Sequence, residues 1–560
     1  MIKASYISSI NRVKIECPFQ EKDVVKDLGA RWDKIEKYWY FPYPTYEIFK
    51  ALKSNGVHFS SALQGLMDDL RYKEDTVKKI KMASPTDLPT FKEIKNLFAH
   101  QTKTVMFGRF RDSYADLSDC GTGKTISTLS VLKERIDKNP NYTVLVVAPK
   151  TIIMSGWVED CAKIYPEISI VAAIGTKNQK LKAFQDDDAN IYVTNYETLH
   201  QDFGFETAGI DCIVFDEAVK LKNPSAGWTK RAIKLSKVIN DKIIISGLIT
   251  PNNLLDIYAP FTILEPDILY KSFYQFKSKF FTPDPFSYMN KSMVPKKGAH
   301  DAIAKRIERL IIRHKKEDCL DLPDKTHIVR EIPMTKEQQG YYNEMAKTFI
   351  VEIGDEKIRA TSAGVKLQKL AQITSGFLYS NEEDVAMQQF HSAKTKELKH
   401  LLEGDLSNEQ VIIFCNYKAE IHILRDMFPD SAFIYGGQTT SEQEHEIQSF
   451  KNNDKRILCA NIKASKYGLT FTNCSTIIYF SMSYSLDDMY QSQERIHRIR
   501  QEKRCTYIYM LAKGSVDKRV LSAIKRKETL KQLILNIIEE NLQHQIIILA
   551  IKVEQLFMKY

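Results

Sequence analysis

Short apolar runs alternate with amphipathic stretches along two long parts of the chain. Residues 90–255 and residues 395–520 each hold four apolar runs of strand length. The runs are Thr143–Ala148, Ile191–Thr194, Asp211–Phe215 and Lys242–Ser246, then Gln410–Phe414, Arg456–Cys459, Thr476–Phe480 and Tyr507–Met510. This alternation is typical of a parallel sheet covered by helices on both faces, whose ligands bind at the carboxyl ends of the strands.

The rest of the chain lacks this rhythm, which divides the sequence into five expected parts. They are a small aromatic and basic module over 1–85, a first α/β lobe over 86–325 with a helical insertion at about 256–325, a helical insertion or linker over 326–394, a second α/β lobe over 395–520, and C-terminal helices over 521–560. Asp87-Leu-Pro89 is expected to be a linker after the module. The fold class predicted is therefore α/β.

Composition narrows the class of protein. A chain of 560 residues is too long for one core, and 43% hydrophobic with 27% charged residues is typical of a soluble globular protein. The net charge of +10 favours a polyanionic partner. Nine scattered cysteines without a C-x-x-C pair argue against structural zinc and for a reducing compartment. The chain shows no signal peptide and no membrane-spanning run, so a cytoplasmic location is expected.

A glycine-rich segment, Gly121-Thr-Gly-Lys-Thr125, lies in the first block. Gly121 and Gly123 let the backbone approach an oxygen-rich anion, and the following helix points its free N–H groups at that anion. Lys124 is expected to bridge the β- and γ-phosphates of a nucleotide, and the Thr125 hydroxyl to hold Mg²⁺. A complete phosphate loop has glycine at position 118, where this chain has Ser118. The alternative is a glycine turn between surface elements.

Two carboxylates follow the apolar run that ends at Phe215. Asp216 is expected to bind Mg²⁺, and Glu217 to polarise the attacking water as a general base. The alternative, an ordinary solvated start of a loop, weakens because a phosphate loop lies upstream. The two segments together predict a nucleoside triphosphatase site.

Two such blocks with one phosphate loop suggest a site shared between lobes. In Gln491-Ser-Gln-Glu-Arg-Ile-His-Arg498, Arg495 and Arg498 are three residues apart and would project from one face of a helix. Paired guanidinium groups that reach across a cleft stabilise a transferring phosphoryl group. The alternative is a solvated basic helix. We expect Gln491 to join the two arginines in the catalytic set.

Taken in order, these segments resemble the motifs of the Snf2 family of superfamily 2 helicase-type ATPases. In the first block, Ala99–Gln101 resembles the Q motif, Gly121–Thr125 motif I, Val144–Pro149 with Trp157 motif Ia, Thr194–Glu197 motif Ib, Asp216–Pro224 motif II, and Ser246–Gly247 with Pro251–Asn253 motif III. Further along, Arg313–Asp318 with Leu322–Pro323 resembles the family's basic stretch, Val411–Phe414 motif IV, Tyr467–Thr472 motif V and Gln491–Gln501 motif VI. The resemblance covers about residues 90–520.

This resemblance implies two RecA-like lobes with helical Snf2-type insertions and a small α+β N-terminal domain. It implies ATP and Mg²⁺ as cofactors, and Gln101 as the reader of adenine. The implied ATP-binding residues are Gln101, Gly121, Thr122, Gly123, Lys124 and Thr125. The compact length also resembles that of phage-encoded or bacterial members.

Three departures from the family pattern concern coupling between the lobes. Val219 stands where motif II usually ends in histidine, and the Thr-Pro of motif III is displaced. Glu494 and Arg500 stand where motif VI usually has glycine. The residues expected to carry hydrolysis are retained.

The family's activity implies an ATP-driven translocase on duplex, forked or single-stranded DNA, involved in remodelling, annealing or branch migration. The implied nucleic-acid contacts in the lobes are Lys150, Thr151, Asn195, Lys220, Lys222, Gly468 and Thr470. Each lysine alone is better explained as a solvated surface charge. The alternatives are a strand-separating helicase, a chromatin-type remodeller, and an ATP-gated DNA-binding scaffold with weak hydrolysis.

In the N-terminal module, Leu28–Asp33 and Lys37–Pro42 are expected to form a hairpin with Trp32 and Trp39 facing each other. Bases stack on such aromatic rings, and Arg31 is expected to hold a phosphate beside them. The alternative is a small core packed on its tryptophans. The layout resembles the HARP-like module of annealing helicases, which implies targeting to forked or annealing DNA.

Overall fold

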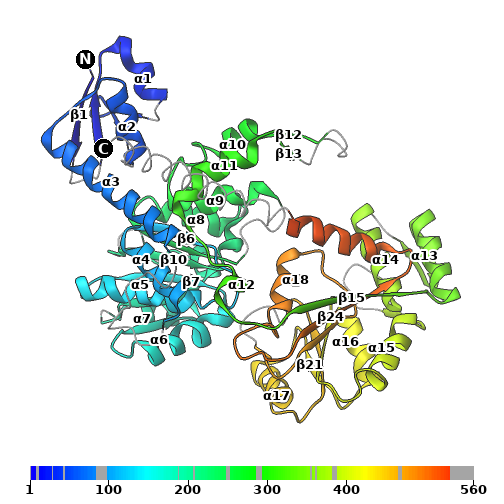
Figure 1. Ribbon diagram of the computed structural model, residues 1–560. Coiled ribbons are helices and arrows are strands. Elements are labelled where there is room, and N and C mark those ends of the chain that lie inside the picture. The colour runs from blue at the N-terminus through cyan, green and yellow to red at the C-terminus, as the bar shows by residue number, and fades with distance from the viewer. Residues whose placement is uncertain are drawn as a thin grey trace, which may run out of the picture.

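The structure is a computed structural model that describes residues 2–7, 12–27, 30–41, 45–83, 97–186, 188–205, 208–247, 253–284, 293–353, 356–359, 362–380, 387–464 and 470–529. Two α/β lobes lie side by side, and a small module stands on the first lobe at the end of a long helix (Figure 1). The predicted linker Asp87–Pro89, Gly468 and most of the predicted C-terminal helices lie outside the described residues.

The N-terminal module is a five-stranded sheet with helices, in the order β3-β4-β2-β1-β5. Its elements are β1 (Lys3–Ile7), β2 (Arg12–Glu16), α1 (Lys22–Asp27), β3 (Arg31–Asp33), β4 (Tyr38–Phe41), α2 (Tyr46–Ser54), β5 (His58–Phe59) and α3 (Ser61–Met82). The predicted hairpin is confirmed: β3 and β4 are antiparallel, and Trp32 faces Trp39 with ring centroids 5.5 Å apart.

Helix α3 belongs to two cores. Leu63 and Met67 near its start pack in the core of the module, whereas Val77 and Ile80 near its end pack with Phe107 in the core of the first lobe. The predicted division at residue 85 therefore separates two units that share one helix. The helix carries the module outward from the first lobe (Figure 1).

The first lobe is built on a seven-stranded parallel sheet, in the order β14-β6-β11-β10-β7-β9-β8. Its strands are β6 (Ser113–Asp116), β7 (Val144–Ala148), β8 (Ile170–Ala173), β9 (Ile191–Asn195), β10 (Cys212–Asp216), β11 (Asp241–Ile245) and β14 (Ile311–Ile312). Its helices are α4 (Ala99–Arg109), α5 (Lys124–Lys138), α6 (Glu159–Ile164), α7 (Lys177–Phe184), α8 (Gly227–Leu235), α9 (Tyr258–Leu264), α10 (Phe273–Phe280), α11 (Ala299–Ile307) and α12 (Lys316–Cys319), with the hairpin β12 (Phe281–Pro283) and β13 (Met293–Pro295).

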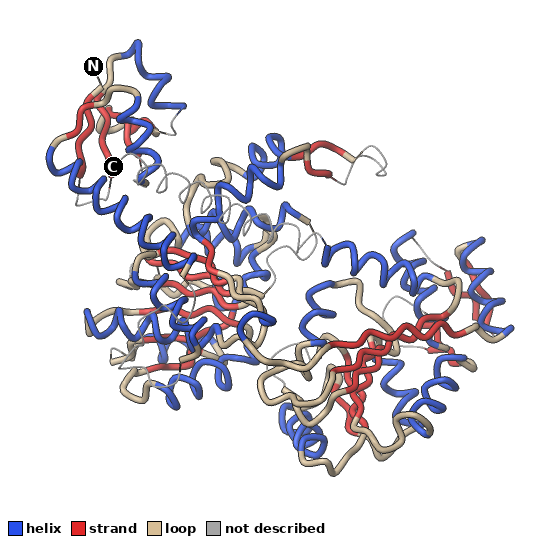
Figure 2. Tube along the Cα trace, viewed as in Figure 1, coloured by secondary structure: helices blue, strands red, loops and turns tan. Residues whose placement is uncertain are grey.

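Burial on both faces explains why the central strands of this sheet were visible as apolar runs. Alternate residues of β7 point to opposite cores: Leu145 and Val147 pack with the helices of the 256–307 region, and Val144 and Val146 pack with α5 and α6. A strand covered on both faces needs apolar side chains at every position. Figure 2 shows the strands of each lobe between layers of helices.

The second lobe is a six-stranded parallel sheet, in the order β15-β24-β23-β20-β22-β21. Its strands are β15 (Lys325–Ile332), β20 (Val411–Cys415), β21 (Ala432–Ile434), β22 (Ile457–Asn461), β23 (Thr476–Tyr479) and β24 (Cys505–Ala512). The other elements are α13 (Lys336–Thr348), β16 (Ile350–Ile353), β17 (Glu356–Arg359), α14 (Ala363–Ser375), β18 (Phe377–Tyr379), β19 (Met387–Gln389), α15 (Ala393–Glu403), α16 (Lys418–Met427), α17 (Thr440–Lys451), α18 (Leu486–Gln493) and a helix over 516–529.

Two boundaries differ from the expectation. Residues 326–332, assigned from the sequence to a helical insertion or linker, form with Lys325 the edge strand β15 of the second lobe. Most of this strand is exposed, so it lacks the apolar run that marked the central strands. The helix over 516–529 crosses the expected boundary at residue 520 without a break.

Candidate active site

The phosphate loop joins β6 to α5 in the first lobe. Gly121 and Gly123 adopt left-handed backbone angles, with φ of 83° and 78°, which explains the glycine at both positions. Ser118, which stands in place of the expected glycine, accepts a hydrogen bond from the His314 N–H at 3.0 Å. That serine ties the loop to the segment through which the chain leaves the first lobe.

The Lys124 ammonium lies inside this loop. Its Nζ donates to the carbonyl oxygens of Ser118 and Asp119 at 2.8 and 2.9 Å. Burial opposes its charge, but the negative groups around it, foremost the Cys120 sulfur and the Asp116 carboxylate, outweigh burial and raise the pKa of Lys124. The lysine is therefore cationic and held where a phosphate group would contact it.

Asp216 and Glu217 stand at the carboxyl end of β10, as predicted. Asp216 is 4% exposed, and its Oδ2 accepts a hydrogen bond from Trp157 Nε1 at 2.9 Å. Burial raises the pKa of Asp216, whereas the bond from Trp157 and the nearby Lys124 lower it. Glu217 has a φ of 51°, a strained angle for a residue with a side chain, and such strain is concentrated at functional sites.

A cavity of about 330 Å³ brings the residues of both lobes together. The first lobe contributes the loop, the two carboxylates and the unpredicted Asp160, and the second lobe contributes the predicted glutamine and both arginines. The residues that line this cavity include Gly121, Gly123, Lys124, Thr125, Asp160, Asp216, Glu217, Thr470, Gln491, Glu494, Arg495 and Arg498. The arrangement places cations on both sides of a space that adjoins two acids.

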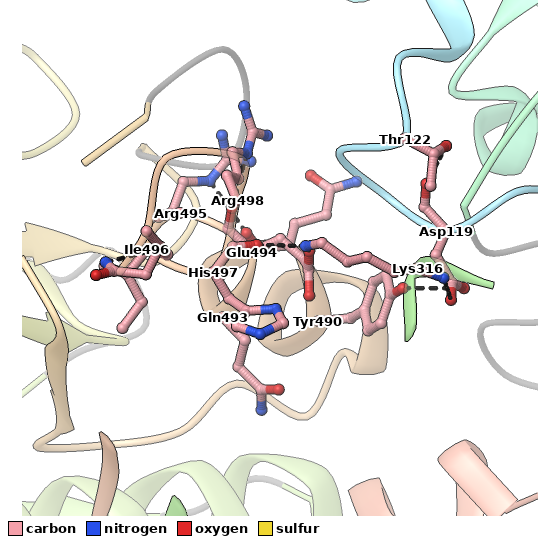
Figure 3. Close-up of polar contacts among 12 residues, drawn as sticks. Asp119, Thr122, Lys316, Tyr490, Gln493, Glu494, Arg495, Ile496, His497 and Arg498 are labelled. Atoms are coloured by element: carbon pink, nitrogen blue, oxygen red, sulfur yellow. Dashed lines mark hydrogen bonds and ion pairs between the residues drawn. The ribbon is translucent and has the colours of Figure 1, made fainter. Parts of the chain in front are cut away.

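The arginines of the second lobe lie on an irregular turn after α18 (Figure 3). Arg495 is 3% exposed and donates through Nε to the Gln491 carbonyl oxygen at 3.0 Å. Burial, and then the charge of Arg498, lower the pKa of Arg495 to about 9, so it stays cationic at neutral pH. Arg498 donates to Thr470 Oγ1 at 2.8 Å.

The residues present fit a triphosphate with a divalent cation. Thr125 in α5 and Asp216 at the end of β10 line the same cavity. They supply the hydroxyl and carboxylate oxygens that Mg²⁺ prefers. Gln491, which is 3% exposed, has a buried Oε1 without a hydrogen-bond partner among the described residues. An acceptor left unsatisfied in this cavity suits a water molecule or another donor that arrives with the substrate.

Gln101 is placed differently from the expectation. Its Nε2 contacts the carbonyl oxygens of Thr122 and Gly123 at 3.3 and 3.5 Å, and its Oε1 accepts from the Phe98 N–H at 2.9 Å. A Cβ added to Gly123 would stand 2.2 Å from the same Nε2. The side-chain amide that was expected to bind adenine therefore contacts the backbone of the phosphate loop. His100 Nε2 lies 2.8 Å from the same Thr122 carbonyl oxygen.

Most of the predicted nucleic-acid contacts in the first lobe follow the carboxyl ends of three neighbouring strands, β9, β7 and β10. Lys150 and Thr151 are exposed, after β7, and Asn195 is bonded to Glu197 at 2.6 Å, after β9. Lys220 and Lys222 are half-buried beside motif II. Thr470 lines the phosphate cavity through its bond to Arg498, so its placement favours ATP chemistry over the predicted DNA contact.

In the module, Trp32 and Trp39 differ in exposure. Trp32 is 47% exposed, whereas Trp39 packs against the core of the module. Arg31, expected to hold a phosphate, forms an ion pair with Asp267 of the first lobe. Among the predicted residues of this module, Trp32 is therefore the one whose ring is available for stacking at the surface.

Residues that the sequence analysis did not assign to the site also shape it. Trp157 holds Asp216, Ser118 is fixed by His314, and Glu494 faces Lys316 between the lobes. Each pair joins segments far apart in the sequence, so no local spacing pointed to them. Trp157 and Glu494 were visible only as parts of motifs Ia and VI.

No helix among the described residues is both long enough and apolar enough to cross a membrane.

Three family models match the chain. The model described as SNF2-related domain matches residues 116–403, more than half of the chain, and the helicase conserved C-terminal domain matches residues 393–500. A domain of unknown function, DUF5710, matches residues 12–46, which include the tryptophan hairpin. The likeness of this module to HARP therefore stays a prediction.

Proteins similar to this chain come from phages, bacteria and plants. Putative protein p41 of Acyrthosiphon pisum secondary endosymbiont phage 1 is 23% identical, over 74% of this chain and 92% of that protein. An uncharacterized ATP-dependent helicase of Mycoplasma pneumoniae is 24% identical and the ATP-dependent DNA helicase DDM1 of Arabidopsis thaliana 26% identical, each over 74% of this chain. The match spans 39% and 58% of those two longer proteins.

Among solved structures, the Sulfolobus solfataricus SWI2/SNF2 ATPase core in complex with dsDNA is similar, with 23% identity and a TM-score of 0.40. That match covers 79% of this chain and 94% of the other.

Proposed function

This chain belongs to the SNF2-related family of helicase-like ATPases, and from that premise we propose that it hydrolyses ATP to move along duplex or forked DNA. The observation that carries the proposal is the cavity between the lobes. It holds a phosphate loop and two acids from one lobe and two arginines from the other, so both lobes must approach each other to complete it. Hydrolysis can then drive their relative movement.

Each residue of the cavity has a distinct role in the proposed cycle. Lys124 binds the β- and γ-phosphates, Glu217 orients and deprotonates the attacking water, and Arg495 with Arg498 stabilises charge that develops on the transferring phosphoryl group. Mg²⁺, when bound by Thr125 and Asp216, neutralises charge on the phosphate oxygens. DNA is expected to stimulate hydrolysis by binding the closed arrangement of the lobes more tightly than the open one.

The net charge of +10 and the expected motif contacts support sequence-independent binding to the DNA backbone. We assign the exposed Trp32 of the module a second role, stacking with unpaired bases at a single-strand junction. Phe19 is a second exposed aromatic ring of this module: it is 79% exposed, with the Lys22 ammonium 3.5 Å from its ring centroid. An intracellular, DNA-associated location follows from this proposal.

The direct test measures ATP turnover without nucleic acid, with single-stranded DNA, with blunt duplex and with a fork, at one salt concentration. We expect strong stimulation by duplex or fork, and its loss in Lys124→Ala and Glu217→Gln. Lys138→Ala, an exposed lysine on the same helix α5, is the control and should behave as wild type. Wild-type turnover in either site variant would refute the site assignment.

The same assay separates the alternatives. Stimulated turnover below about 0.1 s⁻¹, against a typical 1–10³ s⁻¹ for enzymes, would indicate an ATP-gated scaffold. The scaffold is favoured by Val219, a buried apolar residue where the family has a polar one. Displacement of a labelled strand, measured with the same fork, would instead identify a strand-separating helicase.

A further inference from the structure

A buried ion pair joins the two lobes beside the phosphate loop. Lys316, the first residue of α12, contacts Glu494 and also donates to the carbonyl oxygen of His497. Lys316 is 6% exposed and Glu494 is 2% exposed. Lys325 approaches the second oxygen of Glu494 at 3.1 Å. Figure 3 shows the Lys316 side chain pointing toward Glu494.

Lys316 is also fixed to the phosphate loop. Its backbone N–H donates to Asp119 Oδ2 at 3.1 Å, and its ammonium would be 3.5 Å from a Cβ placed on Gly121. The same residue thus touches the loop expected to bind phosphate and the turn that carries the arginines. Glu494 lines both the phosphate cavity and a second cavity, of about 820 Å³, along the segment between the lobes.

The arginine-bearing turn, residues 494–501, is contacted from the segment between the lobes. It lies after the end of α18 and before β24, outside regular secondary structure. The His497 Nε2 contacts the Pro323 carbonyl oxygen at 3.0 Å, so the segment 313–325 meets the turn at His497 and Glu494. That segment is the connection from β14 of the first lobe to β15 of the second lobe.

We propose that Lys316 is a positioning residue for Arg495 and Arg498, which holds their turn against the phosphate loop through Glu494. The inference rests on the proposed hydrolysis of ATP at the shared cavity. Because Lys316 belongs to the segment between the lobes, a change in their separation moves the arginines at the same time. Without the Lys316 charge, Lys325 is the one remaining lysine partner of the buried Glu494 among the described residues. A buried carboxylate that has lost a cationic partner is destabilised, and it is better solvated when it moves toward water.

The test compares Lys316→Met with Lys316→Arg and with Lys305→Met, the same change at an exposed lysine of α11. We expect Lys316→Met to lower kcat by about 10- to 100-fold, the effect of displacing a catalytic group by about 1 Å, and to leave KM for ATP within about threefold. Lys316→Arg should recover part of the rate, and Lys305→Met should retain all of it.

A double-mutant comparison separates positioning from general damage. If Lys316 acts through the arginines, Lys316→Met should lower kcat further by less than about threefold in an Arg495→Ala background. Glu494→Gln, which keeps the shape of the side chain, should show the same loss and the same non-additivity. Without nucleotide, amide hydrogen exchange in residues 494–501 should be faster in Lys316→Met than in wild type.

Wild-type kcat in Lys316→Met, or an unchanged fold-loss in the Arg495→Ala background, would overturn the inference and leave the proposed function standing. Unchanged hydrogen exchange in the turn would also overturn it. Absence of turnover in the wild type under every DNA condition would overturn both.

Discussion

At the scale of single residues, two acids and a lysine lie in one cavity, and a side chain from a distant segment holds one of the acids. The acids at the end of an apolar run and the glycines before a helix follow local rules, and Asp216, Glu217 and Lys124 line one cavity. The donor to Asp216 is Trp157, 59 residues earlier in the chain. Only the order of the strands β7 and β10, which are neighbours in the sheet, brings such a residue near.

We predict that Trp157→Phe shifts the acid limb of ATP hydrolysis to higher pH. The indole N–H lowers the pKa of Asp216 against the effect of burial, so its loss lets that pKa rise. The carboxylate must be ionised to hold Mg²⁺. The measurement is kcat/KM against pH at one fixed, subsaturating Mg²⁺ concentration. Trp228→Phe is the control, and an unmoved acid limb in Trp157→Phe would contradict the role given to the indole.

At the scale of elements, the strands with apolar runs were predictable, whereas the interior strand β6, which reads Ser-Tyr-Ala-Asp, and the exposed edge strand β15 were not. The apolar residues of β15, Ile328 and Val329, are adjacent in the sequence and 36% and 43% exposed, so the strand shows neither an apolar run nor alternation. It is defined by its pairing with β24, over 170 residues later. The tryptophan hairpin was predictable because a short turn fixes its register.

The hairpin leads to a prediction about DNA. Trp32→Ala should weaken binding to a fork or to single-stranded DNA by about fivefold to a hundredfold, the effect of about 1–3 kcal/mol for one stacked base. Binding to blunt duplex should change little. Fluorescence anisotropy with labelled oligonucleotides measures both, and Tyr274→Ala, at a 78% exposed tyrosine of the first lobe, is the control. Equal weakening on duplex and fork would argue against stacking with unpaired bases.

We predict that the protein loses stability in acid because His314, at the contact between α4 and the segment after β14, resists protonation in the folded state. His314 is buried against Thr104, and burial, with the charges of His100 and Lys103, lowers its pKa to about 3. The unfolded chain takes up this proton below about pH 6.5, and the folded protein does not until about pH 3. The contribution of His314 is therefore complete above pH 6.5 and is lost progressively between these values.

The measurement is the thermal midpoint of unfolding from pH 7.5 to 4.5. His314→Gln should unfold at a lower temperature at neutral pH but show a shallower decline with acid than wild type. His445→Gln, at an exposed histidine, should keep the wild-type slope. Equal slopes of the thermal midpoint against pH in all three proteins would show that His314 does not cause the loss of stability in acid.

At the scale of the whole molecule, the two lobes were predictable and the division between the module and the first lobe was not. The composition changes near residue 85, yet α3 places Val77 and Ile80 in the core of the first lobe. A composition change marks where the chain becomes polar, whereas a domain boundary depends on which core a helix packs against. The core against which the end of α3 packs could not be predicted from the sequence alone.

Truncation tests whether α3 stabilises the first lobe. A chain that begins at residue 60 keeps α3 and should retain basal turnover and thermal stability close to wild type. A chain that begins at residue 84 loses two buried side chains of the first lobe, each worth about 1.5–3 kcal/mol, and should unfold at a lower temperature. Equal stability of the two truncations would show that α3 does not support the first lobe.

Helix α3 also sets the spacing between the module and the first lobe. Met67 is anchored in the core of the module and Val77 in the core of the first lobe, and the ten residues of helix from one to the other rise about 15 Å. Each residue added between these anchors would turn the module by about 100° about the helix axis. Insertion of two residues there should therefore point Trp32 in nearly the opposite direction, and we expect it to abolish the fork preference proposed for the module without lowering basal turnover.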